Sequence, residues 1–303
     1  MNTPEKAYQA GFVAVAGRPN VGKSTLINAM LQQKIAAVSA KPQTTRLNQL
    51  GILTDDAAQI VFIDTPGIHD PVHALGEVMN TEAQSALNDA DVILWLVDVS
   101  DIPHAEDRLI ATLLKGRTNI IQALNKIDRV EDPDALAGLQ VKYQKLAPDA
   151  QQIMISALQG AGFDALKAAI ISRLPEGPPF YPDDQVTDIY ERDIAADLIR
   201  EAALEHLHDE IPHSVAIRID EYKEREEIGA LITATMFVER ESQKGIVVGK
   251  GGLMIKKIGT SARKAIEAMS GRKVFLDLRV KVKKNWRSDP AFLNQMGYTA
   301  KKD

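Results

Sequence analysis

The stretch GRPNVGKST, residues 17–25, holds the residues whose types and spacing most clearly suggest chemistry. It follows the apolar run at residues 12–16 and precedes a helical pattern, an order that favours a strand, a glycine-rich turn and a helix. The glycines let backbone amides curl round a β-phosphate, while Lys23 places its ammonium on the β- and γ-phosphate oxygens and Ser24 offers a hydroxyl to Mg²⁺. A nucleoside triphosphate site is therefore predicted. Its candidate residues are Gly17, Arg18, Pro19, Asn20, Val21, Gly22, Lys23, Ser24 and Thr25.

Three later motifs stand at the ends of predicted strands and indicate which nucleotide binds. In DTPG, the carboxylate of Asp64 can hold Mg²⁺ through water and the amide of Gly67 can sense a γ-phosphate. In NKID, Asp128 can accept from N1–H and the 2-amino group of guanine, two donors that adenine lacks. Ser156 and Ala157 would supply a backbone amide to guanine O6. The candidates from these motifs are Asp64, Thr65, Pro66, Gly67, Ile68, Asn125, Lys126, Asp128, Ser156 and Ala157.

A pair of threonines lies between the first two motifs, in QTTR at residues 43–46. Taken in order, GRPNVGKS, this pair, DTPG, NKID and ISA resemble the motifs of the translation-factor class of GTPases. The resemblance implies that one of Thr44 and Thr45 closes on Mg²⁺ when GTP is bound, and it does not choose between them. It also implies that residues 34–50 and 68–81 are switches, ordered by the γ-phosphate and released on hydrolysis. The candidate metal ligands are Ser24, Thr44, Thr45 and Asp64.

The residue after DTPG bears on how water attacks the γ-phosphate. Small signalling GTPases carry a glutamine there to orient the water, and this chain has Ile68. We therefore expect slow intrinsic hydrolysis that needs a partner or a monovalent cation. Asn20 occupies the position that helps hold K⁺ in related GTPases with this hydrophobic replacement; alternatively it only stabilises the turn. The candidate catalytic residues are Asn20, Lys23, Thr44, Thr45 and Gly67.

Apolar runs of strand length alternate with helical patterns through the first half of the chain. This is typical of parallel strands that crossover helices bury on both faces, so an α/β P-loop GTPase domain with a mostly parallel sheet is predicted. Residues 175–182 then carry four prolines, which favours a linker. The predicted strands are residues 12–16, 60–63, 92–97, 120–124 and 153–155.

Beyond the prolines the pattern changes to a helix, two strands, a glycine turn with a helix, and a last strand. The turn is GKGG, residues 249–252, which follows a strand-like stretch at 246–248. A Gly-x-x-Gly turn before a helix matches the clamp of a KH domain, where backbone closely approaches single-stranded RNA. Trp286 either stacks on a base or packs in a core. The candidate RNA-binding residues are Gly249, Lys250, Gly251, Gly252, Lys256, Lys257, Arg279, Lys281 and Lys283.

Charge is distributed unevenly along the chain. The whole sequence has 36 Lys/Arg and 41 Asp/Glu, yet residues 240–303 hold 16 Lys/Arg against 5 Asp/Glu. A basic end on an acidic protein indicates a polyanionic partner. The lack of cysteine excludes disulfides, thiolate zinc sites and thiol nucleophiles. Neither a membrane-spanning apolar run nor a signal-peptide pattern is present, so we expect a cytosolic protein.

A GTPase domain followed by an α+β KH domain resembles the Era family of ribosome-assembly GTPases. The predicted boundaries are 1–174 for the GTPase domain, 175–184 for the Pro-rich linker and 185–303 for the KH domain. The resemblance implies GTP/GDP and Mg²⁺ as cofactors. It also implies the 3′ end of small-subunit ribosomal RNA and the 30S subunit as partners, and peripheral membrane association. We expect a monomer. The alternative is a cell-cycle or signalling GTPase whose basic C-terminal domain docks on membrane or protein.

Overall fold

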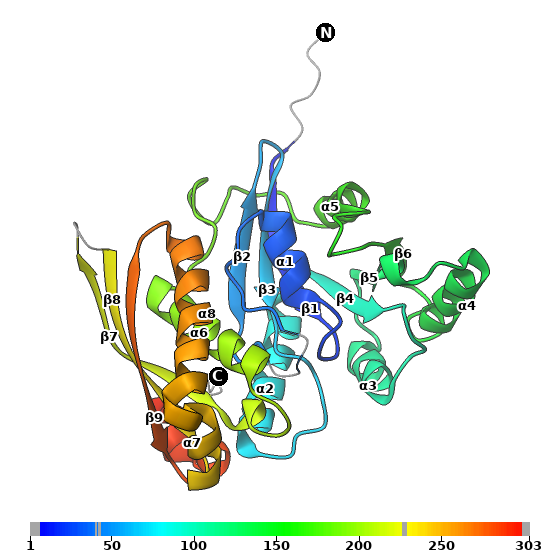
Figure 1. The fold of residues 1–303 in the computed structure, drawn as a ribbon. Helices are drawn as coiled ribbons and strands as arrows, with labels where there is room; N and C mark the ends of the chain where they lie inside the picture. Colours follow the sequence, from blue (N-terminus) through cyan, green and yellow to red (C-terminus); the bar gives the residue numbers. More distant parts are fainter. Residues whose placement is uncertain (1–6, 40, 42–43, 226–228, 299–303) are drawn as a thin grey trace. The chain divides into compact units, whose positions relative to one another are not determined.

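The computed structural model describes residues 7–39, 41, 44–225 and 229–298. Two compact units make up the fold: Met1–Lys34, Thr45–Asp70 and Met79–Asp188 form the first, and Ile35–Thr44, Pro71–Val78 and Ile189–Asp303 form the second. Figure 1 traces their elements along the chain. The strands are β1 (Gln9–Ala16), β2 (Gln49–Thr54), β3 (Ala58–Asp64), β4 (Val92–Asp98), β5 (Ile120–Asn125), β6 (Gln151–Met154), β7 (Ala216–Arg225), β8 (Gly229–Val238) and β9 (Val274–Val282). The α-helices are α1 (Lys23–Leu31), α2 (Ala74–Asp89), α3 (Ala105–Leu114), α4 (Pro133–Gln144), α5 (Phe163–Ile171), α6 (Glu191–His206), α7 (Glu241–Val248), α8 (Leu253–Ser270) and α9 (Pro290–Gln295).

The first unit is built on a six-stranded sheet in the order β2-β3-β1-β4-β5-β6. Five strands run parallel, and β2 pairs antiparallel with β3. Every residue of β3 and β4 is buried, as expected of strands covered on both faces, and Trp95 of β4 is fully buried in the core. The predicted α/β fold with a mostly parallel sheet is therefore confirmed.

The strand order brings the predicted motifs together at the carboxyl ends of the parallel strands. The phosphate loop follows β1, Asp64 ends β3, Asn125 ends β5, and Ser156 comes shortly after β6. Because these strands are parallel and neighbouring, their carboxyl ends lie together, where α/β proteins bind ligands. The sheet thus gathers motifs that lie about 140 residues apart in sequence.

The proline-rich segment forms hydrogen bonds with strands of the first unit. The amide of Ala10 donates to Pro175 O (3.1 Å), and the side-chain oxygen of Gln59 accepts from the amide of Phe180 (2.7 Å). Further along, the amide of Ile52 in β2 donates to Val186 O (2.9 Å). Val186, a few residues beyond the prolines, therefore bonds a backbone donor of the edge strand β2 that would otherwise be open to another chain.

The second unit contains a three-stranded sheet in the order β7-β8-β9, with β7 antiparallel and β9 parallel to β8. Its core joins Leu198 and Ile199 of α6, Ile258 and Ile266 of α8, and Ile232 of β8, all almost completely buried. Among the residues that the structure describes, no helix is long and apolar enough to cross a membrane.

The expectation of a strand at residues 246–248 is wrong, because they belong to α7. A capping box between Arg240 and Gln243 starts this helix, and the amide of Gly249, which has a φ of 73°, donates to Gly245 O at its end. The β-branched residues there suggested a strand, but end-capping and packing of Val247 into the core decide for a helix.

Candidate functional site

The phosphate loop leads into a helix whose first turn is prepared for an anion. Gly22 is the N-cap of α1, no side chain caps the helix, and its first turn holds no acidic residue. Amide groups at such a helix start, together with the positive end of the helix dipole, bind phosphate. Lys23 is buried, and its ammonium donates to the main-chain oxygens of Gly17 (3.1 Å) and Arg18 (3.2 Å).

Burial lowers the pKa of Lys23 from 10.5 to about 8, although the neighbouring Asp64 carboxylate opposes the shift. Because burial destabilises the charged form of the lysine, a neighbouring anion stabilises that form. The residue is thus suited to a bound phosphate, whose negative charge would raise the pKa of the lysine again.

Three oxygen-bearing side chains converge beside this loop. The hydroxyl of Ser24 donates to Asp64 Oδ2 (2.7 Å), the hydroxyl of Thr45 donates to the same oxygen (3.1 Å), and the two hydroxyls lie 3.1 Å apart. Hydroxyl and carboxylate oxygens at such spacing are the donor set that Mg²⁺ takes in proteins, usually with waters and phosphates completing its shell. Thr44 is placed differently, because its hydroxyl donates to Lys41 O (2.9 Å). Of the two threonines, Thr45 is the one that joins Ser24 and Asp64.

The DTPG turn packs closely against the phosphate loop. A Cβ at Gly67 would stand 2.8 Å from Pro19 N, so only glycine fits at this contact. The hydroxyl of Thr65 donates to Val15 O (2.8 Å) and fixes the start of the turn. Ile68 is 2% exposed and belongs to the core cluster that includes Trp95. Its side chain therefore packs inward, in agreement with the expectation that it cannot orient water.

The NKID motif joins the phosphate loop to the loop after β6. The side-chain amide of Asn125 donates to Val21 O (2.7 Å), and its oxygen accepts from the amide of Ala157 (2.8 Å). Lys126 donates to Asn20 O (2.8 Å). Asp128 Oδ1 accepts from the hydroxyl of Ser156 (2.5 Å), which orients the carboxylate predicted to recognise guanine. Ser156 thus contributes to this site through its side chain, while its amide donates to Ala161 O (3.1 Å).

Two carboxylates of this site were missed in the sequence. Asp98 Oδ2 accepts from Lys126 Nζ (2.5 Å) and lies 3.7 Å from Arg18 Nη2, while Arg18 Nε lies 3.3 Å from the buried Asp107 Oδ2. Burial acts to raise the pKa of Asp98, but hydrogen bonds from Lys126 and Ser100 outweigh it and hold that pKa below its usual range. Burial raises the pKa of Asp107. A signal for Asp98 existed, since it directly follows the buried run at 92–97.

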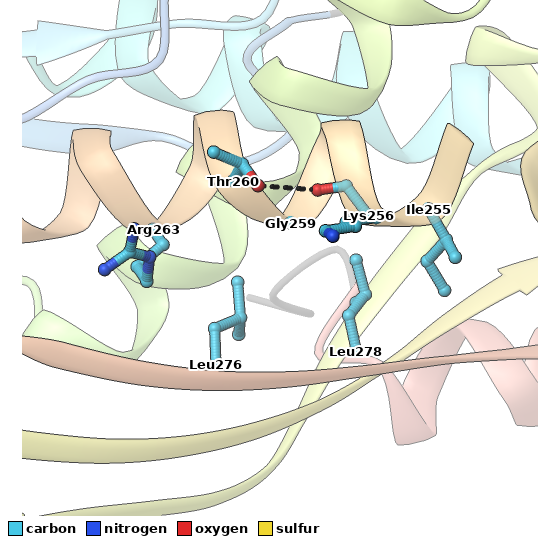
Figure 2. Close-up of a pocket in the computed structure, with 7 residues that line it drawn as sticks. All are labelled: Ile255, Lys256, Gly259, Thr260, Arg263, Leu276 and Leu278. Atoms are coloured by element: carbon cyan, nitrogen blue, oxygen red, sulfur yellow. Dashed lines mark hydrogen bonds between the residues drawn. The ribbon is translucent and has the colours of Figure 1, made fainter. Parts of the chain in front are cut away.

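The second unit carries the predicted glycine clamp between α7 and α8. Gly251 and Gly252 have φ values of 60° and 79°, and nothing lies within 4 Å of where a Cβ would be. Side chains rarely adopt these angles, so glycine leaves the backbone open to close approach. Next to the clamp, a groove of about 280 Å³ runs between α8 and β9, with Leu276 and Leu278 facing the helix (Figure 2). Its lining is Ile255, Lys256, Gly259, Thr260, Arg263, Leu276 and Leu278.

The predicted RNA-binding residues divide between two faces. Lys256 lines the groove, and Lys257 is exposed one residue further along α8. Side chains alternate along β9, so Arg279, Lys281 and Lys283 lie on the sheet face opposite Leu276 and Leu278. Two of the three are partnered there, Arg279 by Asp277 (2.7 Å) and Lys283 by Asp289 (2.8 Å). Trp286 is fully buried and donates from Nε1 to Ser214 O (2.7 Å), so it packs rather than stacks on a base.

Comparison with known proteins gives the family. Residues 12–126 match the model of a 50S ribosome-binding GTPase family, and residues 210–287 match that of the KH domain. GTPase Era of Lactobacillus helveticus is 46% identical over 298 residues, which are 98% of either chain. The chain belongs to the Era family of GTPases. GTPase Era of Carboxydothermus hydrogenoformans is also 46% identical, over 97% of this chain and 99% of its own.

Solved Era structures share this fold over nearly the whole length. An Era structure in complex with MgGDPNP and nucleotides 1506–1542 of 16S ribosomal RNA gives a TM-score of 0.92, at 38% identity and with 96% of this chain covered. A point variant of Aquifex aeolicus Era bound to GDP·AlF4⁻ gives 0.91 over the same share. This Era-family GTPase therefore has the family's complete domain pair.

Proposed function

We propose that this Era-family GTPase uses GTP binding and hydrolysis to control its hold on the 3′ end of small-subunit ribosomal RNA during 30S assembly. The observation that carries the proposal is the open glycine clamp beside a groove, on a chain that also brings Ser24, Thr45 and Asp64 together beside the phosphate loop. A solved relative that aligns over 96% of this chain is bound to nucleotides 1506–1542 of 16S ribosomal RNA, which supports this choice of ligand.

On the nucleotide side, backbone amides of residues 17–25 and Lys23 would hold the phosphates. Asp128 would accept from guanine, with Ser156 orienting it (2.5 Å). Mg²⁺ would be held by Ser24 and Thr45, with Asp64 accepting from their hydroxyls as now or from metal-bound water. When bound, the ion neutralises charge on the phosphates and supplies electrostatic stabilisation during hydrolysis.

A monovalent cation would complete the electrostatics of hydrolysis. Ile68 packs in the core, so residue 68 provides no polar group for the attacking water. We place K⁺ at Asn20, which stands in the phosphate loop at a φ of 65° with its carbonyl accepting from Lys126. A cation there would offset the negative charge that develops in the transition state.

On the RNA side, the backbone of residues 249–252 would approach the ribose-phosphate chain. The aliphatic walls of the groove, Ile255, Leu276 and Leu278, would take unstacked bases. Lys256 and Arg263 at the same groove would contact phosphates or base edges. Ribosomal RNA as the partner implies the cytosol as the place of action. For the domains we propose boundaries of 1–174 and 185–303, with residues 175–184 between them.

The test replaces the central pair of the clamp, as Lys250→Asp with Gly251→Asp. Two carboxylates at the phosphate approach should weaken binding by about 3 kcal/mol, or roughly a hundredfold. Affinity is measured in the full chain for an RNA covering nucleotides 1506–1542 of 16S ribosomal RNA. The matched control is Lys115→Asp with Gly116→Asp, the same dipeptide in the first unit, where the glycine also has a positive φ (80°) and a Cβ would meet nothing within 4 Å.

The control variant should bind RNA within about threefold of the unmodified chain, because it has the same charge change away from the clamp. GTP hydrolysis without RNA and the far-UV circular dichroism should be unchanged in both variants, which shows that both units are folded. RNA binding that survives in the clamp variant would refute the KH-mediated function. The basic C-terminal domain would then be better explained as a membrane or protein docking module of a signalling GTPase.

A further inference from the structure

A second large pocket lies in the first unit, at the end of β5 opposite to the nucleotide loops. Its lining comes from α3, the turn at residues 115–119, the start of β5 and the segment after α4. Figure 1 shows where α3, β5 and α4 lie in the first unit. Ile120 at the start of β5 lines it, whereas Asn125 at the other end of the strand belongs to the nucleotide site. Five residues of strand put about 17 Å between these two positions. The pocket is therefore separate from the nucleotide site.

The floor of this pocket is aliphatic. Leu114 is 3% exposed and Ala150 is 8% exposed, and Ile120, Leu146 and Ala147 are half-buried around them. The volume is about 850 Å³, enough for several side chains of a bound partner. The described lining has no aromatic residue on which a nucleobase could stack, so the floor suits aliphatic or aromatic side chains from a peptide better than single-stranded RNA.

The rim is positively charged. Arg108, Lys115, Arg117 and Lys145 line the pocket, against the single carboxylate of Asp149. Such an excess is unusual here because residues 1–239 of the chain hold 20 Lys/Arg against 36 Asp/Glu. The cationic rim therefore stands out from an acidic surrounding sequence.

These charges are not neutralised within the described part of the chain. The guanidinium of Arg117 donates to Leu87 O (2.5 Å), Leu113 O (3.3 Å) and Asn88 Oδ1 (2.5 Å), all of them uncharged acceptors. Lys115 and Lys145 form neither an ion pair nor a side-chain hydrogen bond with any described residue. Both stand at helix C-termini, where the dipole of each helix offsets about half a charge, and the rim stays positive.

We propose that this pocket binds an acidic amphipathic peptide segment of a protein partner. One or two apolar side chains of the segment enter the floor beside Leu114 and Leu146. Flanking Asp or Glu residues face the ammonium groups of Lys115 and Lys145. An apolar centre with a charged rim is the usual layout of a protein–protein docking site, and rim charges govern partner choice and the salt dependence of binding.

The test selects 12-residue peptides from a random phage-displayed library on the full chain with GDP bound. Enriched peptides are then synthesised with a fluorophore, and their affinities are measured by anisotropy. The informative variant is Lys145→Glu, and the matched control is Lys142→Glu, which makes the same charge reversal at an exposed position of α4 outside the pocket lining. Lys115→Glu serves as a second, independent variant on α3. GTP hydrolysis is measured in all of them to show that they are folded.

Enriched peptides should combine Asp/Glu with aliphatic or aromatic residues and bind more weakly as salt is raised. Reversing one rim charge should weaken their binding about tenfold in Lys145→Glu and Lys115→Glu, and less than about twofold in Lys142→Glu. The proposal is overturned if no acidic peptides are enriched, or if Lys145→Glu and Lys142→Glu bind them equally. It is also overturned if Lys145→Glu instead abolishes binding of an oligouridine RNA, or converts a dimer to a monomer in sedimentation, because the pocket would then serve RNA or self-association.

Discussion

Replacing Asp98 by asparagine should weaken nucleotide binding although Asp98 is not itself a predicted ligand of the nucleotide. The carboxylate accepts from Lys126 of the NKID motif (2.5 Å) and lies 3.7 Å from Arg18 of the phosphate loop. Its side chain is only 9% exposed. The variant keeps an oxygen that can still accept from Ser100, but it turns an uncharged amide toward two cations. Both motifs therefore lose the anion that holds them together.

The size of the effect follows from burial and distance. Two unit charges about 4 Å apart attract by about 4 kcal/mol at the effective dielectric of a protein surface. Desolvation takes back part of this attraction, and removing one partner of a buried pair typically costs about 3 kcal/mol. We expect the free energy of unfolding to fall by that amount. About 2 kcal/mol of this free energy keeps the two loops aligned for the nucleotide. Its loss raises the dissociation constant for GDP about thirtyfold.

Urea denaturation of the nucleotide-free chain gives the unfolding free energy, and titration with a fluorescent GDP analogue gives the affinity. Asp101→Asn is the matched control, because Asp101 lies three residues further along and its side chain is 59% exposed. The control should leave GDP affinity unchanged. Equal GDP affinity in Asp98→Asn and the unmodified chain would refute the role given to this carboxylate. So would equal losses of affinity in both variants.

Three further predictions concern the nucleotide site. Thr45→Ala should slow GTP hydrolysis about a hundredfold by removing a group worth about 3 kcal/mol to the metal. Thr44→Ala removes a hydroxyl that donates to Lys41 O and should change the rate less than about threefold, so similar single-turnover rates for the two variants would contradict the assignment. Asp128→Asn should move nucleotide preference from GDP toward xanthosine diphosphate, since the 2-amino group loses its acceptor, and competition titrations that still favour GDP would show that another residue recognises the base. Exchanging K⁺ for Na⁺ should lower turnover about tenfold, while in Asn20→Ala the two salts should give equal rates; an unmodified chain indifferent to the salt would leave Asn20 as a turn residue only.

Local patterns predicted much of the nucleotide-binding unit because its central strands are buried on both faces. Such strands appear in sequence as continuous apolar runs, and β1, β3, β4 and β5 follow that rule. The edge strand β6 does not, because Gln151 and Met154 are exposed and only Ile153 is buried. Strand β2 escaped notice because it begins and ends with polar Gln49 and Thr54 and a glycine interrupts its short apolar run, as its place at the edge permits. Its register is set by pairing with β3, a contact that no short window of sequence contains.

Contacts between distant residues explain the rest. Two adjacent threonines are equivalent in sequence, and only the folded chain places Thr45, not Thr44, beside Asp64. Asp98 and Asp107 were overlooked because their partner Arg18 lies about 80 residues away or more. On β9 the alternation of charged and apolar residues correctly indicated two faces. It could not show that the groove lies on the apolar face, away from Arg279.

Asn125 shows how the site is made ready before any ligand arrives. Both ends of its buried amide are committed, one to Val21 in the phosphate loop and the other to Ala157 beside the base-recognition loop. The distance between the phosphate-binding and base-binding halves is thus fixed by folding rather than by the nucleotide. The site is consequently preorganised for GDP. The entropy lost on binding is therefore mainly that of GDP itself and not that of ordering these two loops. Guanosine and pyrophosphate, added separately, should therefore each bind to their own half of the site in the absence of the other.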